Sequence, residues 1–303
     1  MADFVFQGVI PPVSTIFDDH LNYDSQGQGK LIDFLIKSGV DGLFFLGSGG
    51  EFSQMTTPER MLVAESVIKL VDGRVPVLIG TGSTNTREAV NLSLHAKAQG
   101  ADGIVVINPY YWHLSAENLR LYFTTIAKAV GDLPVILYNF PDLTGQDLSP
   151  DFVASLVKEC PNIVGIKETL DNIGHITTMN RVVHAVNPNF AVFCGYDNHL
   201  LTNLLSGGAG VISASGNFAP QFTINTYQCF KQGDLAGACE WERYLLQVPR
   251  AYGLDSPFVN VVKEATVLCG LDIPTNVLPP TQPLNADKQA QLKALLAEWD
   301  LIK

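Results

Sequence analysis

Short apolar runs alternate with amphipathic stretches through most of the chain. The runs are rich in β-branched residues and predict eight strands: VFQGVI, LFFLG, VPVLIG, GIVVI, PVILY, IVGIK, FAVFC and GVIS. They contain few polar positions, as expected of parallel strands that are covered on both faces. Between the strands, the periodicity predicts helices over residues 29–38, 58–71, 86–99, 115–130, 149–159 and 171–185. The pattern therefore predicts a repeated unit of one strand followed by one helix.

This order predicts an α/β fold, and eight such units fit a (β/α)8 TIM barrel better than an open doubly wound sheet. From about residue 221 the strand pattern stops, and helices are predicted over residues 227–232, 235–247, 259–269 and 286–302. No low-complexity linker precedes them. We therefore expect a catalytic barrel over residues 1–224 and a helical C-terminal region, residues 225–303, packed on it.

Charge and composition narrow the class of partner. The formal net charge of -11 and the absence of a basic run argue against docking on nucleic acid or anionic lipid, so a small molecule is the expected partner. The five cysteines show no C-x-x-C spacing, which favours reduced thiols. The N-terminus lacks a signal-peptide pattern, and no apolar run is long enough to span a membrane. A cytoplasmic protein is expected.

Two residues at predicted strand ends could carry chemistry, because the active site of a barrel lies at the C-terminal ends of its strands. If Lys167 points inward, burial would lower its pKa and leave a neutral amine that can attack a ketone. Tyr138 ends the preceding strand and could transfer protons beside that amine. The alternative is a lysine that reaches solvent and a tyrosine that only caps the core.

The turn Gly47-Ser48-Gly49-Gly50-Glu51 follows the second predicted strand. Its glycines expose backbone N–H groups that could hold a carboxylate, while the Ser48 hydroxyl donates a further hydrogen bond. An ordinary connecting turn is the alternative. Neither this turn nor Gly80-Thr81-Gly82 matches a dinucleotide-binding fingerprint.

Together, four ordered motifs resemble the pyruvate-dependent aldolase family that includes dihydrodipicolinate synthase and N-acetylneuraminate lyase: GSGGE, PYY, YNFP and GIKE. The resemblance covers the whole chain and implies that Lys167 forms an imine with pyruvate or the keto acid. It implies that Tyr138 shuttles protons and that Ser48, where the family usually has threonine, links Tyr138 to a second tyrosine, Tyr111. It also implies binding of the keto-acid carboxylate by the amides of Ser48 and Gly49.

Departures from the family pattern bear on the substrate. Leu143 stands where dihydrodipicolinate synthases carry an arginine for the second substrate, and Asn198 stands where sialic acid lyases carry a glutamate. The motifs look most like the 2-keto-3-deoxygluconate aldolase branch. This likeness implies reversible cleavage of a 2-keto-3-deoxy sugar acid into pyruvate and an aldehyde such as glyceraldehyde. Further substrate-binding candidates are Gly195, Asp197, Asn198, Ile212, Ser213, Ser215 and Asn217.

Other functions remain open at this point. A dihydrodipicolinate synthase, a dehydratase that uses the same imine, and a non-catalytic keto-acid binding protein are the alternatives. The six histidines lack H-x-H or H-x-x-x-H spacing, so no metal and no cofactor are expected. The resemblance also implies a homo-oligomer, a dimer of dimers, in which Tyr111 completes the site of a neighbouring subunit.

Overall fold

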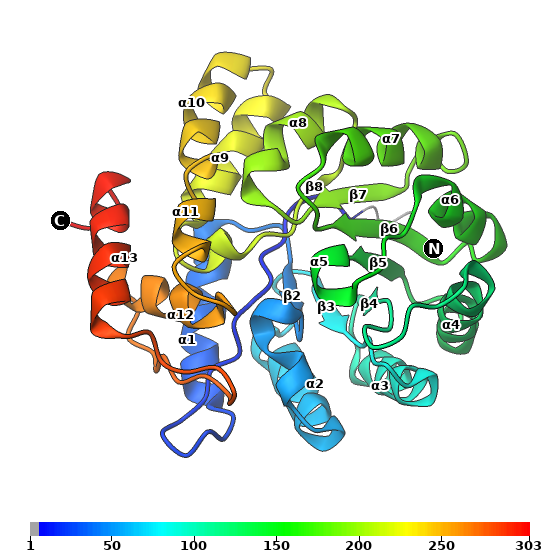
Figure 1. Ribbon diagram of the computed structural model, residues 1–303, viewed down its shortest axis with the longest axis horizontal. Coiled ribbons are helices and arrows are strands. Elements are labelled where there is room, and N and C mark those ends of the chain that lie inside the picture. Colours follow the sequence, from blue (N-terminus) through cyan, green and yellow to red (C-terminus); the bar gives the residue numbers. More distant parts are fainter. Residues whose placement is uncertain (1–5) are drawn as a thin grey trace.

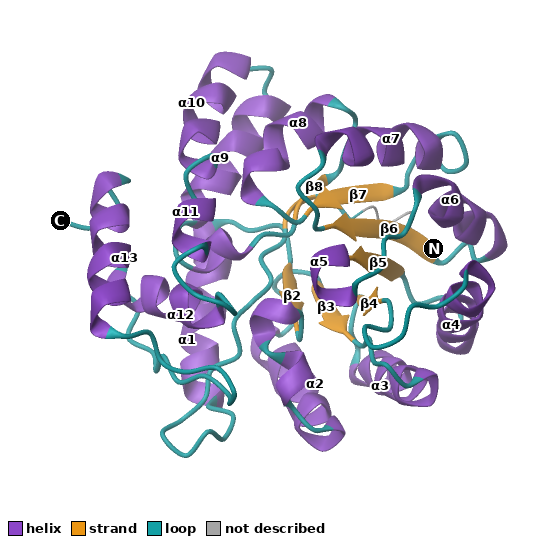
Figure 2. Ribbon diagram, viewed as in Figure 1, coloured by secondary structure: helices purple, strands orange, loops and turns teal. Residues whose placement is uncertain are grey.

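A computed structural model describes residues 6–303, in which one parallel sheet curls into a barrel surrounded by helices (Figures 1 and 2). The strand order is β1-β8-β7-β6-β5-β4-β3-β2. This confirms the predicted (β/α)8 barrel; the first residues of its predicted first strand and first domain lie outside the described residues. The strands are β1 (Gly8–Val9), β2 (Leu43–Phe45), β3 (Val77–Gly80), β4 (Gly103–Ile107), β5 (Val135–Asn139), β6 (Ile163–Glu168), β7 (Ala191–Cys194) and β8 (Gly210–Val211).

The barrel closes through the segment that follows β1. The Val13 amide donates to the Phe44 carbonyl at 2.8 Å, and the Phe44 amide donates to the Pro11 carbonyl at 3.0 Å. These bonds continue the ladder from β1 around to β2, so the sheet has no open edge at this side.

The helices around the barrel lie close to their predicted ranges. Helix α1 begins earlier than predicted because the Asp24 side chain caps it, accepting hydrogen bonds from the amides of Gln26 and Gly27. Short helices α5 (Pro141–Thr144) and α8 were not predicted. The helices that surround the barrel are α1 (Ser25–Ser38), α2 (Thr57–Val71), α3 (Thr86–Gln99), α4 (Ala116–Val130), α6 (Pro150–Glu159), α7 (Ile173–His184), α8 (Leu200–Leu205) and α9 (Pro220–Lys231).

The expected domain boundary after residue 224 falls inside helix α9 (Pro220–Lys231), so the structure places the end of the barrel after this helix. Pro220 stands in the first turn of α9 and presets the backbone for a helix, so α9 begins before the predicted residue 227. Helix α9 packs against β1 and α1 and belongs to the barrel. The C-terminal region therefore begins with the helix that follows, and Figure 1 shows it along one side of the barrel: α10 (Leu235–Leu245), α11 (Pro249–Tyr252), α12 (Val259–Leu268) and α13 (Ala286–Glu298).

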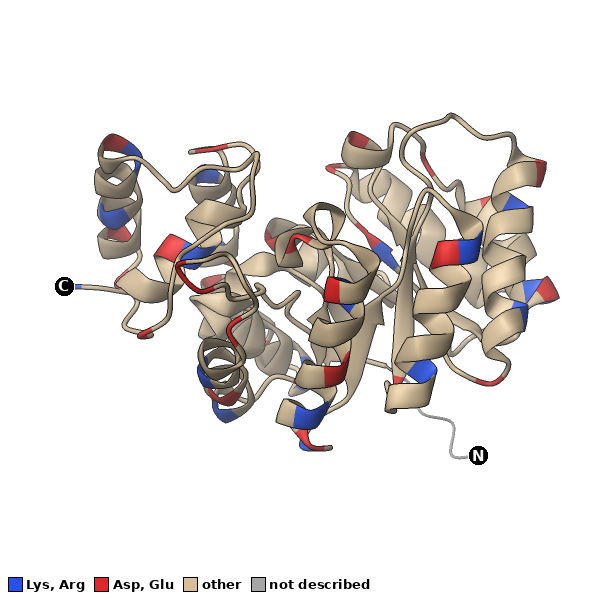
Figure 3. Ribbon diagram, turned by 90° about the horizontal axis from the view of Figure 1, so that it is seen from below, with Lys and Arg blue, Asp and Glu red and all other residues tan. Residues whose placement is uncertain are grey.

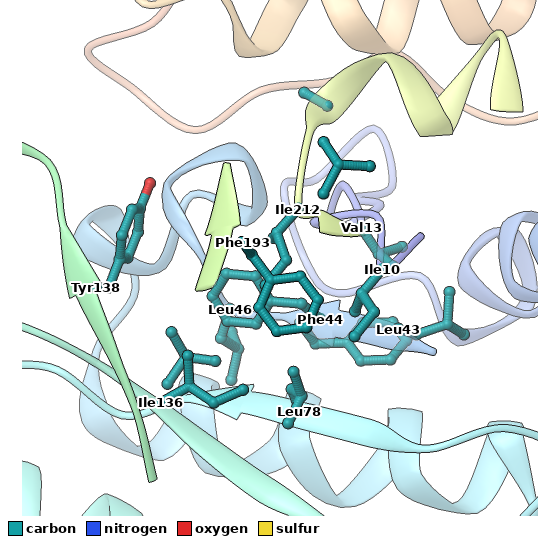
Figure 4. Packing of buried hydrophobic residues seen from close by; sticks show 14 of the residues in the cluster. Ile10, Val13, Leu43, Phe44, Leu46, Leu78, Ile136, Tyr138, Phe193 and Ile212 are labelled. Carbon is teal, nitrogen blue, oxygen red and sulfur yellow. The ribbon is translucent and has the colours of Figure 1, made fainter. Parts of the chain in front are cut away.

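Apolar side chains fill the barrel interior. Phe44 and Phe193 are almost completely buried there, together with Ile136 and Leu78 (Figure 4). Tyr138 stands at the edge of this packed layer with its hydroxyl directed away from it (Figure 4). Because the interior is solid, polar chemistry is confined to the mouth of the barrel at the C-terminal ends of the strands.

The outer surface carries mixed charge. Figure 3 shows acidic and basic positions interspersed on the outer helices instead of one basic face. Within residues 6–303, no helix is long and apolar enough to cross a membrane. The five cysteines are free thiols.

Candidate active site

Lys167 lies near the end of β6, paired in register with Tyr138 of β5. Its side chain is buried, with 4% of the residue exposed. The Nζ atom lies 4.4 Å from the centre of the Tyr138 ring and 5.5 Å from that of Phe44. The predicted inward orientation of the lysine is therefore observed, and the amine is enclosed by aromatic rings.

Burial changes the protonation of this amine. Desolvation lowers the pKa of Lys167 to about 7, although the negative charge of Asp197 partly opposes that shift. An amine with such a pKa is substantially neutral at neutral pH. It is therefore suited to nucleophilic attack on a carbonyl.

Tyr138 supplies a hydroxyl group next to the amine. Its hydroxyl lies 3.4 Å from the Ser48 Oγ atom, and its ring stacks on Phe140 with centroids 5.9 Å apart. Burial raises the pKa of Tyr138 to about 12, so the phenol keeps its proton at neutral pH. It can therefore donate a proton and recover it through Ser48 or a bound ligand.

The glycine-rich turn forms a short 3-10 helix, η1 (Ser48–Gly50), directly after β2. Gly47 is required before it because a Cβ atom at this position would lie 2.6 Å from the Phe44 ring. The first amides of such a helix have no acceptor within the helix. Ser48 and Gly49 line the cavity above Lys167.

Glu51 ends this turn and forms a buried ion pair with Lys263 of α12. The Glu51 Oε1 and Lys263 Nζ atoms are 2.6 Å apart, and both side chains are almost fully buried. The second Glu51 oxygen accepts a hydrogen bond from the Leu278 amide at 2.7 Å. The C-terminal region is thus tied directly to the turn that carries Ser48.

Two adjoining cavities open above Lys167. The inner one, about 190 Å³, is lined by Ser48, Gly49, Tyr138, Lys167, Thr169, Gly195, Ile212 and their neighbours. The outer cleft, about 910 Å³, lies between the barrel mouth and the C-terminal region. The two share Ser48, Phe140, Tyr252 and Phe258. A small acid fits the inner cavity, and a longer chain can extend into the outer cleft.

The predicted substrate-binding residues divide into two groups. Gly195 and Ile212 line the inner cavity beside Ser48 and Gly49. Asp197 and Ser213 are not among the residues that line it. The Asp197 carboxylate is buried and accepts hydrogen bonds from Ser215 and, at 2.9 Å, from the Tyr252 hydroxyl.

Asn217 also serves the scaffold. Its side chain accepts from the Ser14 amide and donates to the carbonyls of Pro12 and Ala214, which leaves no free group for a substrate.

Tyr111 lies outside both cavities of the single chain, with 82% of the residue exposed beside Trp112. Its expected role in a neighbouring subunit stays a prediction.

Eight residues that line the inner cavity were not predicted as site residues: Pro12, Phe140, Asp142, Thr169, Tyr196, Ala214, Tyr252 and Phe258. Thr169 stands two positions after Lys167, so strand alternation could have placed it on the same side. Its hydroxyl is buried beside Tyr138, and a hydrogen bond between the two side chains partly opposes the raised pKa of Tyr138. Tyr252 and Phe258 come from the C-terminal region, and no local pattern marks them.

Within the described residues, no group of three or more His, Cys, Asp or Glu could hold a metal ion.

A family model supports this picture. The model of the dihydrodipicolinate synthetase family matches residues 5–299. The chain belongs to this family. The motif resemblance drawn from the sequence is thereby confirmed.

Two relatives from one organism are similar to this chain over nearly its whole length. YagE of Escherichia coli (strain K12), a candidate 2-dehydro-3-deoxy-D-gluconate aldolase, is 56% identical over 98% of both chains. YjhH of the same strain, a candidate 2-dehydro-3-deoxy-D-pentonate aldolase, is 52% identical over 98% of both. A crystal structure of YagE in complex with pyruvate superposes with a TM-score of 0.97 at 55% identity, covering 98% of this chain and all of that one. The chain is thus an enzyme, a carbon–carbon lyase.

Proposed function

We propose that the protein is a class I aldolase that reversibly cleaves a 2-keto-3-deoxy sugar acid into pyruvate and an aldehyde such as glyceraldehyde. The observation that carries the proposal is the buried Lys167 amine, whose pKa of about 7 and position against the Tyr138 ring suit it to imine formation. The pyruvate held by the similar YagE structure supports the choice of keto acid.

The reaction follows from these two groups. The neutral Lys167 amine adds to the C2 carbonyl, and loss of water leaves a protonated imine. The C4 hydroxyl then gives up its proton, the C3–C4 bond breaks, and its electron pair moves into the imine to form an enamine. The aldehyde departs. Protonation of the enamine at C3 and hydrolysis release pyruvate and regenerate the amine. The iminium is the electron sink, so the mechanism needs neither metal nor cofactor.

The two cavities suggest how the substrate lies. The pyruvate half would occupy the inner cavity, its carboxylate on the amides of Ser48 and Gly49 and its reacting carbon near the Tyr138 hydroxyl. The Thr169 hydroxyl, which also lies against Tyr138, would bind a sugar hydroxyl as the chain leaves this cavity. The remaining polyol would extend into the outer cleft.

Charge in the outer cleft favours a neutral aldehyde. Lys288 lines the cleft but is paired with Asp255 at 2.7 Å, and Leu143 contributes an apolar side chain. An aldehyde with its own charge, such as aspartate semialdehyde, therefore meets no unpaired cation among the described residues of the cleft lining. This disfavours dihydrodipicolinate synthesis. A dehydratase using the same imine would instead keep the carbon chain intact, and product analysis separates the two.

We further propose a cytoplasmic homotetramer built as a dimer of dimers. Tyr111 and Trp112 expose 82% and 73% of their surface in one chain, as expected for residues that a second subunit covers. In such an assembly, Tyr111 would reach Ser48 of the neighbour. A Tyr111→Phe variant that remains assembled should lose activity; full activity would count against this role.

Borohydride trapping with pyruvate tests the proposed chemistry. Peptide mass mapping should locate a reduced adduct on Lys167 and none in the Lys167→Ala protein. Lys128→Ala, which removes an exposed surface lysine, serves as the matched control and should trap normally. Absence of an adduct in the unmodified protein would overturn the imine. Incubation with 2-keto-3-deoxygluconate should then yield pyruvate and glyceraldehyde.

A further inference from the structure

A polar cluster lies directly behind Tyr138 and Lys167, on the opposite face of the two strands. It contains Asn139 of β5, Glu168 of β6, His175 of α7 and Asp147 from the loop between α5 and α6. The proposed reaction uses none of these side chains.

The side chains form a closed set of contacts around His175. Its Nε2 atom lies 3.1 Å from Asp147 Oδ2, and its Nδ1 atom lies 3.2 Å from Glu168 Oε2. The side-chain Nδ2 atom of Asn139 donates hydrogen bonds to Asp147 at 2.7 Å and to Glu168 at 3.2 Å. Four separate elements of the chain are thereby joined through side chains alone.

Charge and burial show what holds the cluster together. Glu168 and Asn139 are completely buried, and the His175 side chain is 13% exposed. A hydrogen bond to Asp147 and the nearby Glu168 carboxylate raise the pKa of His175 to about 10, so the ring is an imidazolium at neutral pH. A buried carboxylate needs such a partner, because unpaired charge in the protein interior is costly.

The position of the cluster connects it to the active site. Asn139 and Glu168 immediately follow Tyr138 and Lys167, and the two pairs stand opposite each other in the β5–β6 ladder. The register of that ladder shifts once, between Val135 and Ile136, and the pairing is regular from there to Asn139 and Glu168 at its end. Successive strand residues point to opposite faces, so fixing Asn139 against Glu168 also fixes Tyr138 against Lys167.

We propose that His175 is a positioning residue, which bridges Asp147 and Glu168 and so holds the Tyr138 hydroxyl and the Lys167 amine at their working separation. This inference rests on the proposed imine function. Small displacements of reacting groups lower rates strongly, whereas they affect binding of the small keto acid less. Loss of the bridge should therefore reduce kcat more than it raises KM.

The test compares His175→Phe, which keeps a ring but removes both contacts, with His175→Gln, which keeps one amide donor. Active sites are first counted by pyruvate and borohydride trapping at Lys167. Per trapped site, kcat should fall about 10- to 100-fold in His175→Phe, with KM within about 3-fold, and less in His175→Gln. His184→Gln on the same helix, where the ring hydrogen-bonds the Phe190 carbonyl at 2.9 Å, is the matched control and should keep its kcat.

The outcomes separate the two proposals. A purely structural role would lower the yield of folded protein but leave kcat per trapped site unchanged in both His175 variants, which would overturn the inference. If His175→Phe does not fold, His175→Gln carries the comparison. If the unmodified protein traps no pyruvate at Lys167, the imine function itself fails, and the positioning role fails with it.

Discussion

The Lys167 amine lies over the face of the Tyr138 ring, 4.4 Å from its centre. An aromatic face attracts the ammonium form, while burial favours the neutral amine, so the same environment acts on the lysine in two opposing directions. The resulting pKa of about 7 leaves both protonation states accessible at neutral pH. Tyr138 thereby influences the nucleophile through its ring as well as through its hydroxyl.

Removing only the hydroxyl separates these two effects. Tyr138→Phe keeps the ring against Lys167 but removes the proton carrier that contacts Ser48. We expect kcat for cleavage to fall by about 10²- to 10⁴-fold, the usual contribution of a positioned proton donor. Thermal unfolding should change little. Steady-state kinetics on protein with equal trapped sites checks this, and near-normal kcat would remove Tyr138 from the mechanism.

The lowered pKa of Lys167 predicts a pH dependence of imine formation. The trapping rate with cyanoborohydride should rise with pH, with a midpoint near pH 7, because only the neutral amine attacks. A midpoint near the ordinary lysine value of 10.5 would show that the amine is not desolvated in solution.

The same shift has a consequence for folding. Between about pH 7 and the ordinary value of 10.5, the unfolded chain binds a proton at Lys167 that the folded chain does not. The contribution of this residue to the free energy of unfolding should therefore increase as pH rises through that window. His175 acts oppositely, since its raised pKa gives stability that is full below pH 6.5 and lost as pH rises through about 10. Urea unfolding of Lys167→Met and the unmodified protein at several pH values isolates the lysine contribution.

The buried Glu51–Lys263 pair should matter strongly for stability. Lys263→Met leaves the Glu51 carboxylate buried without its cation, which should reduce the free energy of unfolding by about 3–5 kcal/mol. Replacing both partners with apolar residues should restore part of the loss. Lys30→Ala breaks an exposed pair with Asp272 and should cost less than about 1 kcal/mol. Urea unfolding measures these losses. If Lys263→Met and Lys30→Ala reduced the free energy of unfolding equally, the strong contribution assigned to the Glu51–Lys263 pair would be contradicted.

Gly195 should tolerate no side chain. A Cβ atom there would lie 1.9 Å from the Thr169 Oγ1 atom, so Gly195→Ala must displace a residue that lines the inner cavity. We expect weaker pyruvate binding and a loss of stability of about 1–3 kcal/mol, typical of overpacking. Adding Thr169→Gly should recover stability. Calorimetric titration with pyruvate and thermal unfolding check both effects, and unchanged binding would place the pyruvate elsewhere.

The sequence predicted the barrel because every strand is a continuous apolar run followed by a helix. It also predicted Lys167 and Tyr138, because the active-site side chains of a barrel come from the C-terminal ends of its strands. Asp197 and Ser213 were predicted as substrate-binding candidates, but neither lines the inner cavity, and Asp197 instead accepts hydrogen bonds from Ser215 and Tyr252. Lys263 and Tyr252 could not be found, because their partners Glu51 and Asp197 lie far away along the chain.

The Tyr252 contact with Asp197 bears on the order in which the protein is made. The nucleophile and its phenol leave the ribosome well before α11, yet Tyr252 at the end of that helix forms part of the wall of both cavities. A growing chain that lacks α11 would leave this wall open, so water would reach Lys167 and keep more of its amine protonated. Catalytic competence would arrive only when the last helices dock, which couples the onset of turnover to completion of translation.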